Sequence, residues 1–235
     1  PPILSGLVGS EMCIRDSILT SNILNAATDK IVVAGGCFWC VEADFESLDG
    51  VKEAISGYTG GTIENPSYKE VVRGGTGHYE AVEIEYDPAI ISLDSILYIF
   101  LRSVDVTDDG GQFCDRGESY RTAIFIDNKL QNEKAQVALN EAQKELNRKI
   151  VTPIVKLEKF YIAEDYHQDY YKGENIILTR YGPRKQSSAY KLYRKSCRRD
   201  DTVTVSYTHL TLPTKAYVYI SVVAVALKKR GGVGG

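Results

Sequence analysis

Residues 31–46 read IVVAGGCFWCVEADFE, and the rest of the chain is organised around this stretch. The β-branched residues 31–33 are typical of a buried strand, which Gly35 and Gly36 end. Apolar residues then recur at helical spacing: Val41, Phe45 and Leu48. This pattern predicts an amphipathic helix that begins directly after Cys37, so that Cys37 lies where a strand ends and a helix starts.

The position of Cys37 predicts a reactive thiol. The first N–H groups of a helix have no partner within the helix, and with the helix dipole they favour a negative charge. A free cysteine titrates near ~8.5, and a helix N-terminus can lower this to roughly 3.5–7.5. We therefore expect Cys37 to be a nucleophile with a lowered pKa; the alternative is a buried structural cysteine.

The composition excludes some classes of partner. The chain has 235 residues, of which 43% are hydrophobic and 25% charged, and its net charge is −3. These values are typical of one sizeable globular domain or two small ones, and they favour neither nucleic acid nor a membrane as partner. Sixteen tyrosines favour a tyrosine-lined pocket. The five cysteines are an odd number, which indicates redox or metal use of a few of them rather than a disulfide scaffold.

The two ends of the chain differ in character from its middle. PPILSGLVGSEMCIRDS at the start and VSYTHLTLPTKA at 205–216 resemble translated sequencing adapters. Residues 18–27 are modestly apolar and end in small residues, as a remnant of a secretory signal does. We expect 1–29 to be non-native or a signal remnant, 30–200 to be one catalytic domain, and 201–235 to be a non-native or disordered tail. The expected location is the cytoplasm, or the periplasm if a signal peptide has been lost.

The remaining patterns predict an α+β fold. Strands are expected over residues 51–58, 78–86, 120–127 and 151–157. Helices are expected over residues 68–73, 92–104, 129–149 and 164–171, and a long Gly/Asp loop over 105–119. This order predicts a sandwich with an antiparallel or mixed sheet and helices on one face. From Gly173 onward the pattern is loose, and a basic run predicts a surface tail: Arg194, Lys195, Arg198 and Arg199.

Four polar residues are candidates to act beside Cys37. Glu80 lies in an otherwise apolar strand, where it is either a proton donor in a pocket or an ordinary exposed glutamate. Tyr68 and Tyr120 are either core residues or hydrogen-bond donors to a substrate oxygen. Asp115 lies in the long loop beside Arg116, where it is either part of a site or a residue that forms a loop ion pair or a turn.

A zinc site is disfavoured by the cysteine spacing. The candidate ligands are Cys37, Cys40, Cys114 and Cys197. They contain only one CxxC pair, so the second half of the usual zinc spacing is missing. We therefore expect no metal.

Six segments of the chain match one known family. They are GGCFWCVEADFESLDGV, SGYTGG, NPSYKEV, GGTGHYEAVEIEYDP, QFCDRGESYRTAIF and FYIAEDYHQDYY. Together they resemble the peptide methionine sulfoxide reductase A family, over residues 30–200. The resemblance implies an α+β sandwich with a ferredoxin-like core. It also implies reduction of methionine S-sulfoxide, free or in proteins, as a repair reaction under oxidative stress.

The resemblance implies roles for individual residues. The family's nucleophile aligns with Cys37, its sulfoxide-binding acid with Glu80, and its pocket aspartate with Asp115. Its two tyrosines that contact the substrate oxygen align with Tyr68 and Tyr120. These residue types suit the reaction, because a sulfoxide sulfur is a poor electrophile until its oxygen is protonated or strongly hydrogen-bonded.

The implied chemistry needs no metal or organic cofactor. Phe38 and Trp39 match the aromatic residues that hold the substrate methyl group. The Cys37 thiolate attacks sulfur and takes the oxygen, which leaves a sulfenic acid and methionine. A second thiol then condenses with the sulfenic acid, and a thioredoxin-like donor reduces the resulting disulfide. We expect the enzyme to be a monomer.

The residues leave the identity of the second thiol open. Cys40 replaces a glycine that is frequent in the family and forms a CxxC pair with Cys37 on one helical turn. Cys197 lies in the tail, where many members keep a resolving cysteine. We favour Cys40 as the first resolving thiol, with Cys197 passing the disulfide outward, and treat Cys114 as a structural neighbour. The stretch 173–190 departs from the tail expected for the family.

Two other functions fit parts of the sequence. A thioredoxin-like disulfide oxidoreductase also carries CxxC after a strand, and Thr152–Pro153 before an apolar strand imitates its cis-proline. That alternative leaves Glu80 and Tyr68 unexplained. A noncatalytic peptide- or metal-binding module would instead use the tyrosine-rich surface.

Overall fold

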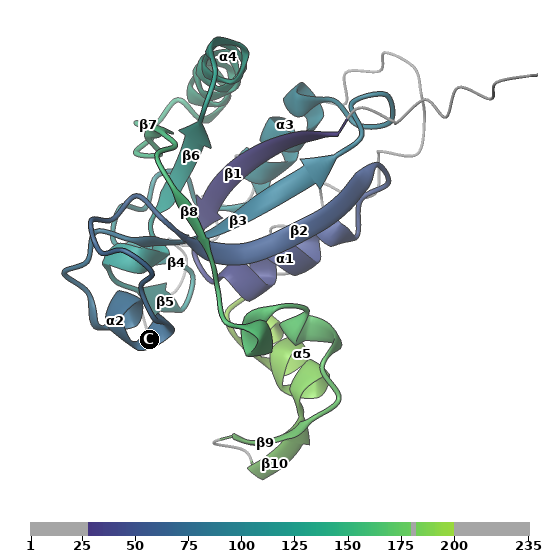
Figure 1. The fold of residues 1–235 in the computed structure, drawn as a ribbon. Helices are drawn as coiled ribbons and strands as arrows, with labels where there is room; N and C mark the ends of the chain where they lie inside the picture. Colours follow the sequence, from purple (N-terminus) through teal and green to yellow (C-terminus); the bar gives the residue numbers. More distant parts are fainter. Residues whose placement is uncertain (1–27, 180–181, 200–235) are drawn as a thin grey trace, which may run out of the picture.

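The computed structural model describes residues 28–179 and 182–199 (Figure 1). The two ends that we expect to be non-native, with the expected signal remnant inside the first, lie outside these residues apart from Thr28 and Asp29. Within the described part of the chain, no helix is both long enough and apolar enough to cross a membrane.

A six-stranded sheet forms the centre of the molecule, in the order β7-β6-β1-β3-β2-β8 (Figure 1). Its strands are β1 (Asp29–Gly35), β2 (Val51–Thr59), β3 (Tyr79–Tyr86), β6 (Thr122–Ile126), β7 (Ile154–Lys156) and β8 (Phe160–Ile162). The strand predicted before Cys37, β1, lies between β3 and β6. Only the β6–β7 pair of this sheet is parallel, so the sheet is mixed, as predicted.

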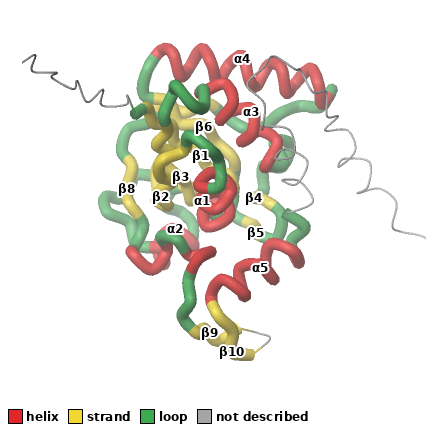
Figure 2. The backbone as a smooth tube through the Cα atoms, turned by 90° about the vertical axis from the view of Figure 1, so that its right-hand side faces the viewer, coloured by secondary structure: helices red, strands yellow, loops and turns green. Residues whose placement is uncertain are grey.

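The main core contains residues of the helices α1 (Phe38–Glu46), α3 (Leu93–Ser103) and α4 (Lys129–Leu146) (Figure 2) and one buried residue, Val71, of a shorter helix. Successive strand residues point to opposite faces of the sheet. Ile31 and Val33 therefore join the core beneath the helices, while Val32 and Ala34 join a smaller cluster on the other face. The residues at helical spacing after Cys37 are buried, as predicted: Val41, Phe45 and Leu48.

Shorter elements surround the end of β1. The predicted helix α2 (Tyr68–Arg73) begins after Ser67, which forms a capping box. The long loop after α3 contains a small hairpin of β4 (Gly111–Gln112) and β5 (Asp115–Arg116) and then a 3-10 turn, Glu118–Tyr120. This loop therefore has structure of its own next to Cys37.

The single helix predicted over 164–171 is wrong. Two 3-10 turns, Asp165–His167 and Tyr170–Lys172, take its place. Asp169 between them has a left-handed conformation with φ 52°, and its N–H donates to the Glu42 carboxylate. The Asp169 N–H therefore donates to a side chain of α1 instead of to a backbone carbonyl one turn earlier, as it would in a continuous helix.

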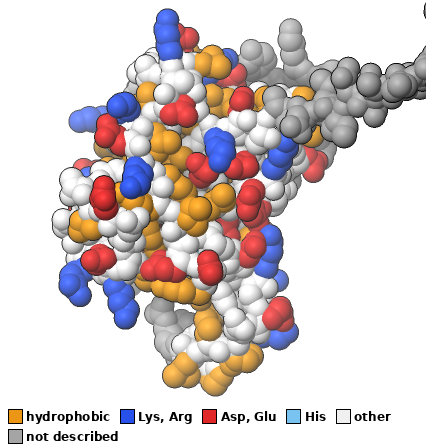
Figure 3. Space-filling view, in the orientation of Figure 1, with side chains coloured by type: hydrophobic (Ala, Val, Ile, Leu, Met, Phe, Trp, Pro, Cys, Tyr) orange, Lys and Arg blue, Asp and Glu red, His pale blue; other side chains and the backbone are white. Residues whose placement is uncertain are grey.

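The loose pattern after Gly173 conceals ordered structure. The chain forms a hairpin of β9 (Ile176–Thr179) and β10 (Gly182–Lys185), followed by helix α5 (Gln186–Ser196), below α1 in Figure 1. Hydrophobic side chains gather at the end of this hairpin in Figure 3, among them Leu178, which is 85% exposed.

Two of the four basic residues at the end of α5, Arg194 and Arg199, are buried. The prediction that this run belongs to a surface tail is therefore wrong for these two residues. Arg194 and Arg199 are only 8% and 2% exposed. Arg194 Nη1 donates to Asp44 Oδ1 on α1 at 2.6 Å. The run therefore meets a buried carboxylate more than a hundred residues away, whereas Lys195 and Arg198 are exposed as predicted.

Candidate active site

The site begins at the N-terminus of α1. Cys37 is the N-cap residue, as predicted, and its carbonyl accepts a hydrogen bond from the Cys40 N–H at 3.0 Å. Gly36 has φ +81°, and a Cβ at this position would lie 2.5 Å from the Cβ of Gln112. Only glycine fits this turn, which brings the end of β1 against the β4–β5 hairpin.

A cavity of about 60 Å³ lies beside Cys37. Its lining residues are Cys37, Phe38, Trp39, Tyr68, Glu80, Asp115, Tyr120 and Tyr193. All but Tyr193 are residues predicted for the site. The eight residues come from six places in the fold: the start of α1, then α2, β3, β5, the turn before β6, and α5. The volume suits the end of one side chain rather than a large ligand.

Glu80 reaches the cavity from β3. It is only 1% exposed, which excludes the alternative of an exposed strand glutamate. Its Oε2 accepts a hydrogen bond from the Phe38 N–H at 3.1 Å, whereas its Oε1 has no hydrogen-bond partner among the described residues. Burial raises the pKa of Glu80 to about 8, although the Phe38 N–H acts in the opposite direction. The carboxyl is therefore neutral at neutral pH and able to donate a proton.

Tyr68 and Tyr120 place two hydroxyls near this carboxyl. Tyr68 is the first residue of α2, Tyr120 ends the turn before β6, and a hydrogen bond joins their hydroxyls. Burial, and then the charge of Glu80, raises the pKa of both tyrosines. Both hydroxyls therefore keep their protons and can donate to an oxygen in the cavity.

Asp115 faces the cavity from β5, and the ion pair with its neighbour Arg116 does not form. Arg116 Nη1 bonds instead to Asp108 Oδ2 at 2.6 Å. Asp115 Oδ2 accepts a short hydrogen bond from the Tyr193 hydroxyl of α5. Burial raises the pKa of Asp115, and this hydrogen bond and the charge of Arg199 partly offset the effect. The contact ties α5 to the cavity.

Trp39 is held by the two 3-10 turns. The Tyr170 ring stacks on the indole with ring centroids 3.7 Å apart and an interplanar angle of 6°. The indole Nε1–H donates to His167 Nδ1 at 3.1 Å. Burial lowers the pKa of His167 to about 4, so the imidazole is neutral and its Nδ1 can accept this hydrogen bond. These contacts fix the aromatic wall of the cavity.

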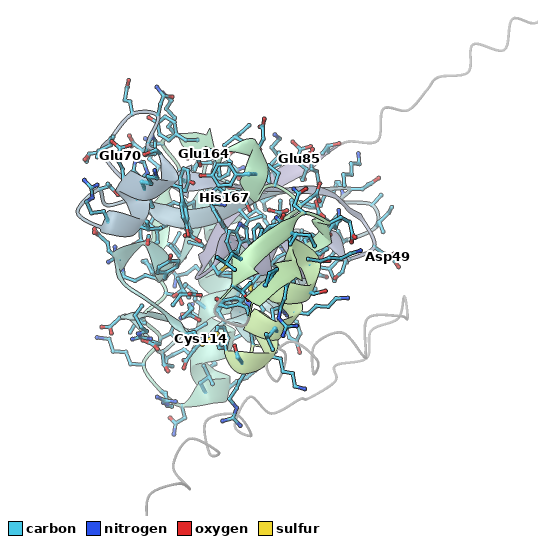
Figure 4. The ribbon with its side chains drawn as sticks, turned by 90° about the horizontal axis from the view of Figure 1, so that it is seen from below. Asp49, Glu70, Glu85, Cys114, Glu164 and His167 are labelled. Carbon is cyan, nitrogen blue, oxygen red and sulfur yellow. A yellow bond between two sulfur atoms is a disulfide. The ribbon has the colours of Figure 1, made fainter. Side chains whose placement is uncertain are left out.

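Glu164 connects α2 to the sheet on the same side. It accepts hydrogen bonds from the Tyr58 hydroxyl at 2.8 Å and from the Tyr68 N–H at 3.0 Å. In Figure 4, Glu164 and His167 lie near each other, while Cys114 lies apart from them, beside α5. Two segments that follow β8 therefore contact the site: the 3-10 turns on the side of Trp39 and Tyr68, and α5 on the side of Asp115.

The four described cysteines divide into two pairs. Cys37 and Cys40 are free thiols with 6% and 0% exposure. Cys114 forms a disulfide with Cys197 at the end of α5, with Cα atoms 5.3 Å apart. In this state Cys197 is not a free thiol that could resolve a sulfenic acid. Cys114, which we expected to be only a structural neighbour of the site, is its disulfide partner. The four residues do not form a four-thiolate metal site.

The helix N-terminus alone predicts a lowered pKa for the Cys37 thiol, but in the structure the lowered pKa belongs to Cys40. The hydrogen bond with Cys40, followed by burial and nearby negative charge, raises the pKa of Cys37 well above its ordinary value. Burial also acts on Cys40, but the hydrogen bond from Cys37 and the guanidinium groups of Arg199 and Arg194 outweigh it and lower the pKa of Cys40. The lowered pKa predicted for Cys37 is therefore wrong for this state. The Phe38 N–H at the start of α1 points to Glu80 instead.

Four residues of the site had no role in the sequence analysis: Glu164, His167, Tyr170 and Tyr193. The first three belong to FYIAEDYHQDYY, where the density of tyrosines and acidic residues was the available signal. Tyr193 lies where the pattern is loose, and no local signal indicated it.

Fold and cavity together define a class of protein. A mixed sheet packed with helices holds a buried thiol pair at a strand–helix junction. A neutral carboxylic acid and two protonated tyrosine hydroxyls meet the first thiol in a small cavity with aromatic walls. This arrangement is that of a cysteine-dependent oxidoreductase that acts on a small oxygen-bearing group.

Comparisons with known proteins identify the family. A family model described as "Peptide methionine sulfoxide reductase" matches residues 29–201. The peptide methionine sulfoxide reductase MsrA 2 of Caulobacter vibrioides is 44% identical over 174 residues, which are 74% of this chain and 82% of that protein. The chain therefore belongs to the peptide methionine sulfoxide reductase family.

Two further relatives show the extent of the likeness. The peptide methionine sulfoxide reductase MsrA/MsrB of Vibrio cholerae is 43% identical over 164 residues, which are 69% of this chain but only 43% of that longer protein. The solved structure of Mxr1 from Saccharomyces cerevisiae in reduced form has a TM-score of 0.60 at 31% sequence identity. The match covers 63% of this chain and 86% of that one, so the folds agree over this matched part.

Proposed function

We propose that this chain reduces the S-sulfoxide of methionine, free or in proteins, to methionine, and so repairs oxidised proteins. The observation that carries the proposal is the meeting of Cys37, a neutral Glu80 and the Tyr68 and Tyr120 hydroxyls in one cavity. Membership of the family supports the same reaction. Thiol–disulfide exchange, the reaction of a thioredoxin-like oxidoreductase, requires neither the Glu80 carboxyl nor the Tyr68 and Tyr120 hydroxyls beside the thiol.

The end of a methionine sulfoxide side chain fits the two kinds of wall. The aromatic faces of Phe38 and Trp39 receive the S-methyl group, and the polar wall with Glu80 receives the oxygen. With methyl group and oxygen assigned to different walls, only one epimer presents its sulfur to Cys37. This is the physical basis for selection of the S-sulfoxide.

In the first chemical step, Cys37 loses its proton and reacts as the thiolate: Glu80 donates a proton to the sulfoxide oxygen while the Cys37 sulfur attacks the substrate sulfur. The substrate S–O bond breaks, the oxygen stays on Cys37 as a sulfenic acid, and methionine leaves. The substrate sulfur gains two electrons, which Cys37 supplies. Glu80 is left ionised until the next cycle.

Resolution of the sulfenic acid is assigned to Cys40. Cys40 is a free thiol on the same helical turn as Cys37, whereas Cys197 is bonded to Cys114. Attack by Cys40 on the sulfenic sulfur forms a Cys37–Cys40 disulfide and releases the oxygen as water. Cys197 can accept that disulfide only after its own bond to Cys114 has been reduced.

A dithiol protein such as thioredoxin regenerates the enzyme by thiol–disulfide exchange. We propose that the enzyme acts as a monomer in the cytoplasm, where such reductants are abundant. Light scattering after size-exclusion chromatography tests the oligomeric state, and fractionation of cells that express the native gene tests the location.

Replacement of the nucleophile tests the reaction. Cys37→Ser should turn over a methionine S-sulfoxide peptide at less than about a tenth of the wild-type rate, because a serine hydroxyl cannot replace the thiolate. Methionine is measured by chromatography with dithiothreitol as reductant, and circular dichroism confirms that the variant is folded. Glu133→Gln, on the exposed side of α4, is the matched control and should retain full activity.

An insulin-reduction assay run in parallel separates the alternative. A wild-type protein that reduces insulin rapidly but leaves the sulfoxide peptide unchanged would establish a disulfide oxidoreductase. Substantial turnover by Cys37→Ser would refute Cys37 as the nucleophile.

A further inference from the structure

A buried charged cluster packs against Cys40, and the reaction proposed above makes no use of it. Arg194 Nη1 donates to Asp44 Oδ1 at 2.6 Å and to the Cys40 carbonyl at 3.4 Å. Arg199 Nη1 donates to the Gly35 carbonyl at 3.0 Å, and its Nη2 lies 3.4 Å from Asp44 Oδ2. The cluster thus joins the end of the chain's described part to both sides of the β1–α1 turn.

Arg199 is incompletely paired for a buried cation. It is 2% exposed, and its Nε has no hydrogen-bond partner among the described residues. Asp44, the carboxylate that it meets at 3.4 Å, makes a shorter bond to Arg194. A guanidinium removed from water in this way strongly favours a further anion in its surroundings.

Cys40 can supply that anion. Its side chain is 0% exposed and packs in one cluster with Cys37 and Tyr190, and a hydrogen bond joins the two thiols. The other titratable or charged groups that act on it are Asp44 of α1, Glu80 of β3, Tyr190, Tyr193 and Arg194 of α5, and Arg199. Burial keeps Glu80 and both tyrosines neutral. Asp115, on which the charge of Arg199 also acts, already accepts the hydrogen bond of Tyr193, and Asp44 is already bonded to Arg194. Cys40 is therefore a further acid next to the arginines.

We propose that Arg199 holds Cys40 as the resting thiolate, and that Cys40 is the base that takes the proton of Cys37 when the substrate binds. The proposal rests on the reaction proposed above and adds two roles to it. Cys40 acts catalytically before it resolves, and Arg199 is a positioning residue that acts through Cys40. The lowered pKa of Cys40 and the raised pKa of Cys37 agree with this distribution of charge.

The atoms and electrons balance along this route. Cys40 takes the proton from Cys37, Glu80 gives its proton to the oxygen, and methionine leaves as the sulfenic acid forms. The Cys40 sulfur then attacks the Cys37 sulfur, the S–O bond of the sulfenic acid breaks, and the proton held by Cys40 leaves with the hydroxyl as water. The two cysteine sulfurs together lose the two electrons that the substrate sulfur gains.

A single turnover without reductant tests the base, because it separates the first methionine from resolution. Protein with free Cys37 and Cys40 is mixed with one equivalent of a methionine S-sulfoxide peptide, and methionine is followed by rapid quenching. At neutral pH, Cys40→Ser should form the first methionine at least about tenfold more slowly than wild type, the usual scale for loss of a general base. The deficit should shrink at alkaline pH, where solvent base removes the Cys37 proton.

Substitutions of Arg199 test the positioning role. Arg199→Gln should slow the first methionine and move its pH profile to higher pH, whereas Arg199→Lys keeps the charge and should restore the wild-type profile. Arg198→Gln is the matched control, because Arg198 is exposed one residue earlier. Ultraviolet absorbance of thiolate gives a readout without turnover: it should be present in reduced wild type at neutral pH and lost in Cys40→Ser. Circular dichroism monitors the fold of each variant.

Each outcome decides a part of the proposal. A first methionine at the wild-type rate in Cys40→Ser overturns the role of Cys40 as base, and an unchanged pH profile in folded Arg199→Gln overturns the role of Arg199. If Arg199→Gln does not fold, the thiolate absorbance of reduced wild type at neutral pH decides, and its absence overturns the proposal. A wild-type protein that makes no methionine refutes the reaction itself. A first bridge from Cys37 to Cys197 refutes only resolution by Cys40, and the rate of the first methionine still decides its role as base.

Discussion

At the scale of single residues, burial decides what a carboxyl can do. Glu80 and Glu83 lie on the same strand, but Glu80 is buried in the cavity while Glu83 bonds to Lys30 at the surface. Desolvation disfavours the charged form, so the buried carboxyl of Glu80 holds a proton at neutral pH. The same residue type therefore serves as a proton donor at one position and as part of a surface ion pair at another.

Glu80→Gln should lower kcat/KM for methionine sulfoxide by about 10²-fold or more at neutral pH, because an amide cannot donate a proton to the oxygen. In wild type the rate should fall as pH rises past about 8, the pKa of Glu80, since the acid is then ionised. The variant should lack this fall. Initial rates across the pH range provide the measurement, and Glu83→Gln is the control. Identical profiles for wild type and Glu80→Gln would show that another group supplies the proton.

At the scale of elements, α5 completes the site from a distance in sequence. Tyr193 reaches Asp115, Arg194 reaches Asp44, and Cys197 is bonded to Cys114. Each contact joins α5 to an element that precedes it by dozens of residues. The helix has an ordinary polar and basic sequence, so its place at the cavity follows from its partners and not from its own pattern.

Tyr193→Phe should weaken the contact between α5 and the cavity without removing the ring. Loss of a hydrogen bond worth about 1 kcal/mol corresponds to an increase of about fivefold in KM for the sulfoxide peptide. Steady-state kinetics measure the change. Tyr166→Phe is the matched control, because Tyr166 is 61% exposed, and its KM should stay at the wild-type value. An unaltered KM in Tyr193→Phe would place the Tyr193 hydroxyl outside the substrate site.

The disulfide should contribute to stability through the length of chain that it closes. Cys114 and Cys197 are separated by 83 residues. The double variant Cys114→Ser/Cys197→Ser should lose about 2–4 kcal/mol of unfolding free energy, because its unfolded chain regains conformational entropy. Urea denaturation without reductant measures the loss. Equal urea midpoints for the variant and the oxidised wild type would mean that the crosslink is absent or without effect in solution.

At the scale of the whole molecule, the buried acid makes folding depend on pH. Glu80 titrates near 4.5 when unfolded and at about 8 when folded, so the folded state binds more protons between these values. Stability from this group is therefore present below its unfolded pKa and is lost as pH rises through its folded pKa.

Between pH of about 6 and about 8, wild type should lose about 2 kcal/mol of unfolding free energy relative to Glu80→Gln. Urea denaturation of both proteins at several pH values measures the difference, and the comparison cancels other groups that titrate in this range. A difference that does not change with pH would mean that Glu80 is ionised in the folded protein.

Local patterns in the sequence were sufficient for five of the six strands of the sheet, for α1, α2, α3 and α4, and for the position of Cys37, but they did not indicate β8. β-Branched runs, glycine pairs and helical spacing act over a few residues, and the structure confirms what they predict. The matched motifs also placed Glu80, Tyr68, Tyr120 and Asp115 together, and the cavity contains all four. The sequence by itself therefore determined the fold class, the family and most of the cavity.

Only the tertiary structure decided the charge on the thiols, the disulfide and the place of α5. Asp44 and Arg199 are 155 residues apart, and neither carries a local signal that it will be buried against the other. The pKa of Cys37 depends on Cys40, on burial and on charges from other elements, which outweigh the helix N-terminus that the sequence indicated. Contacts of this kind depend on which distant surfaces meet when the chain packs, because electrostatic energy in a protein interior is set by distance in space and by exclusion of water.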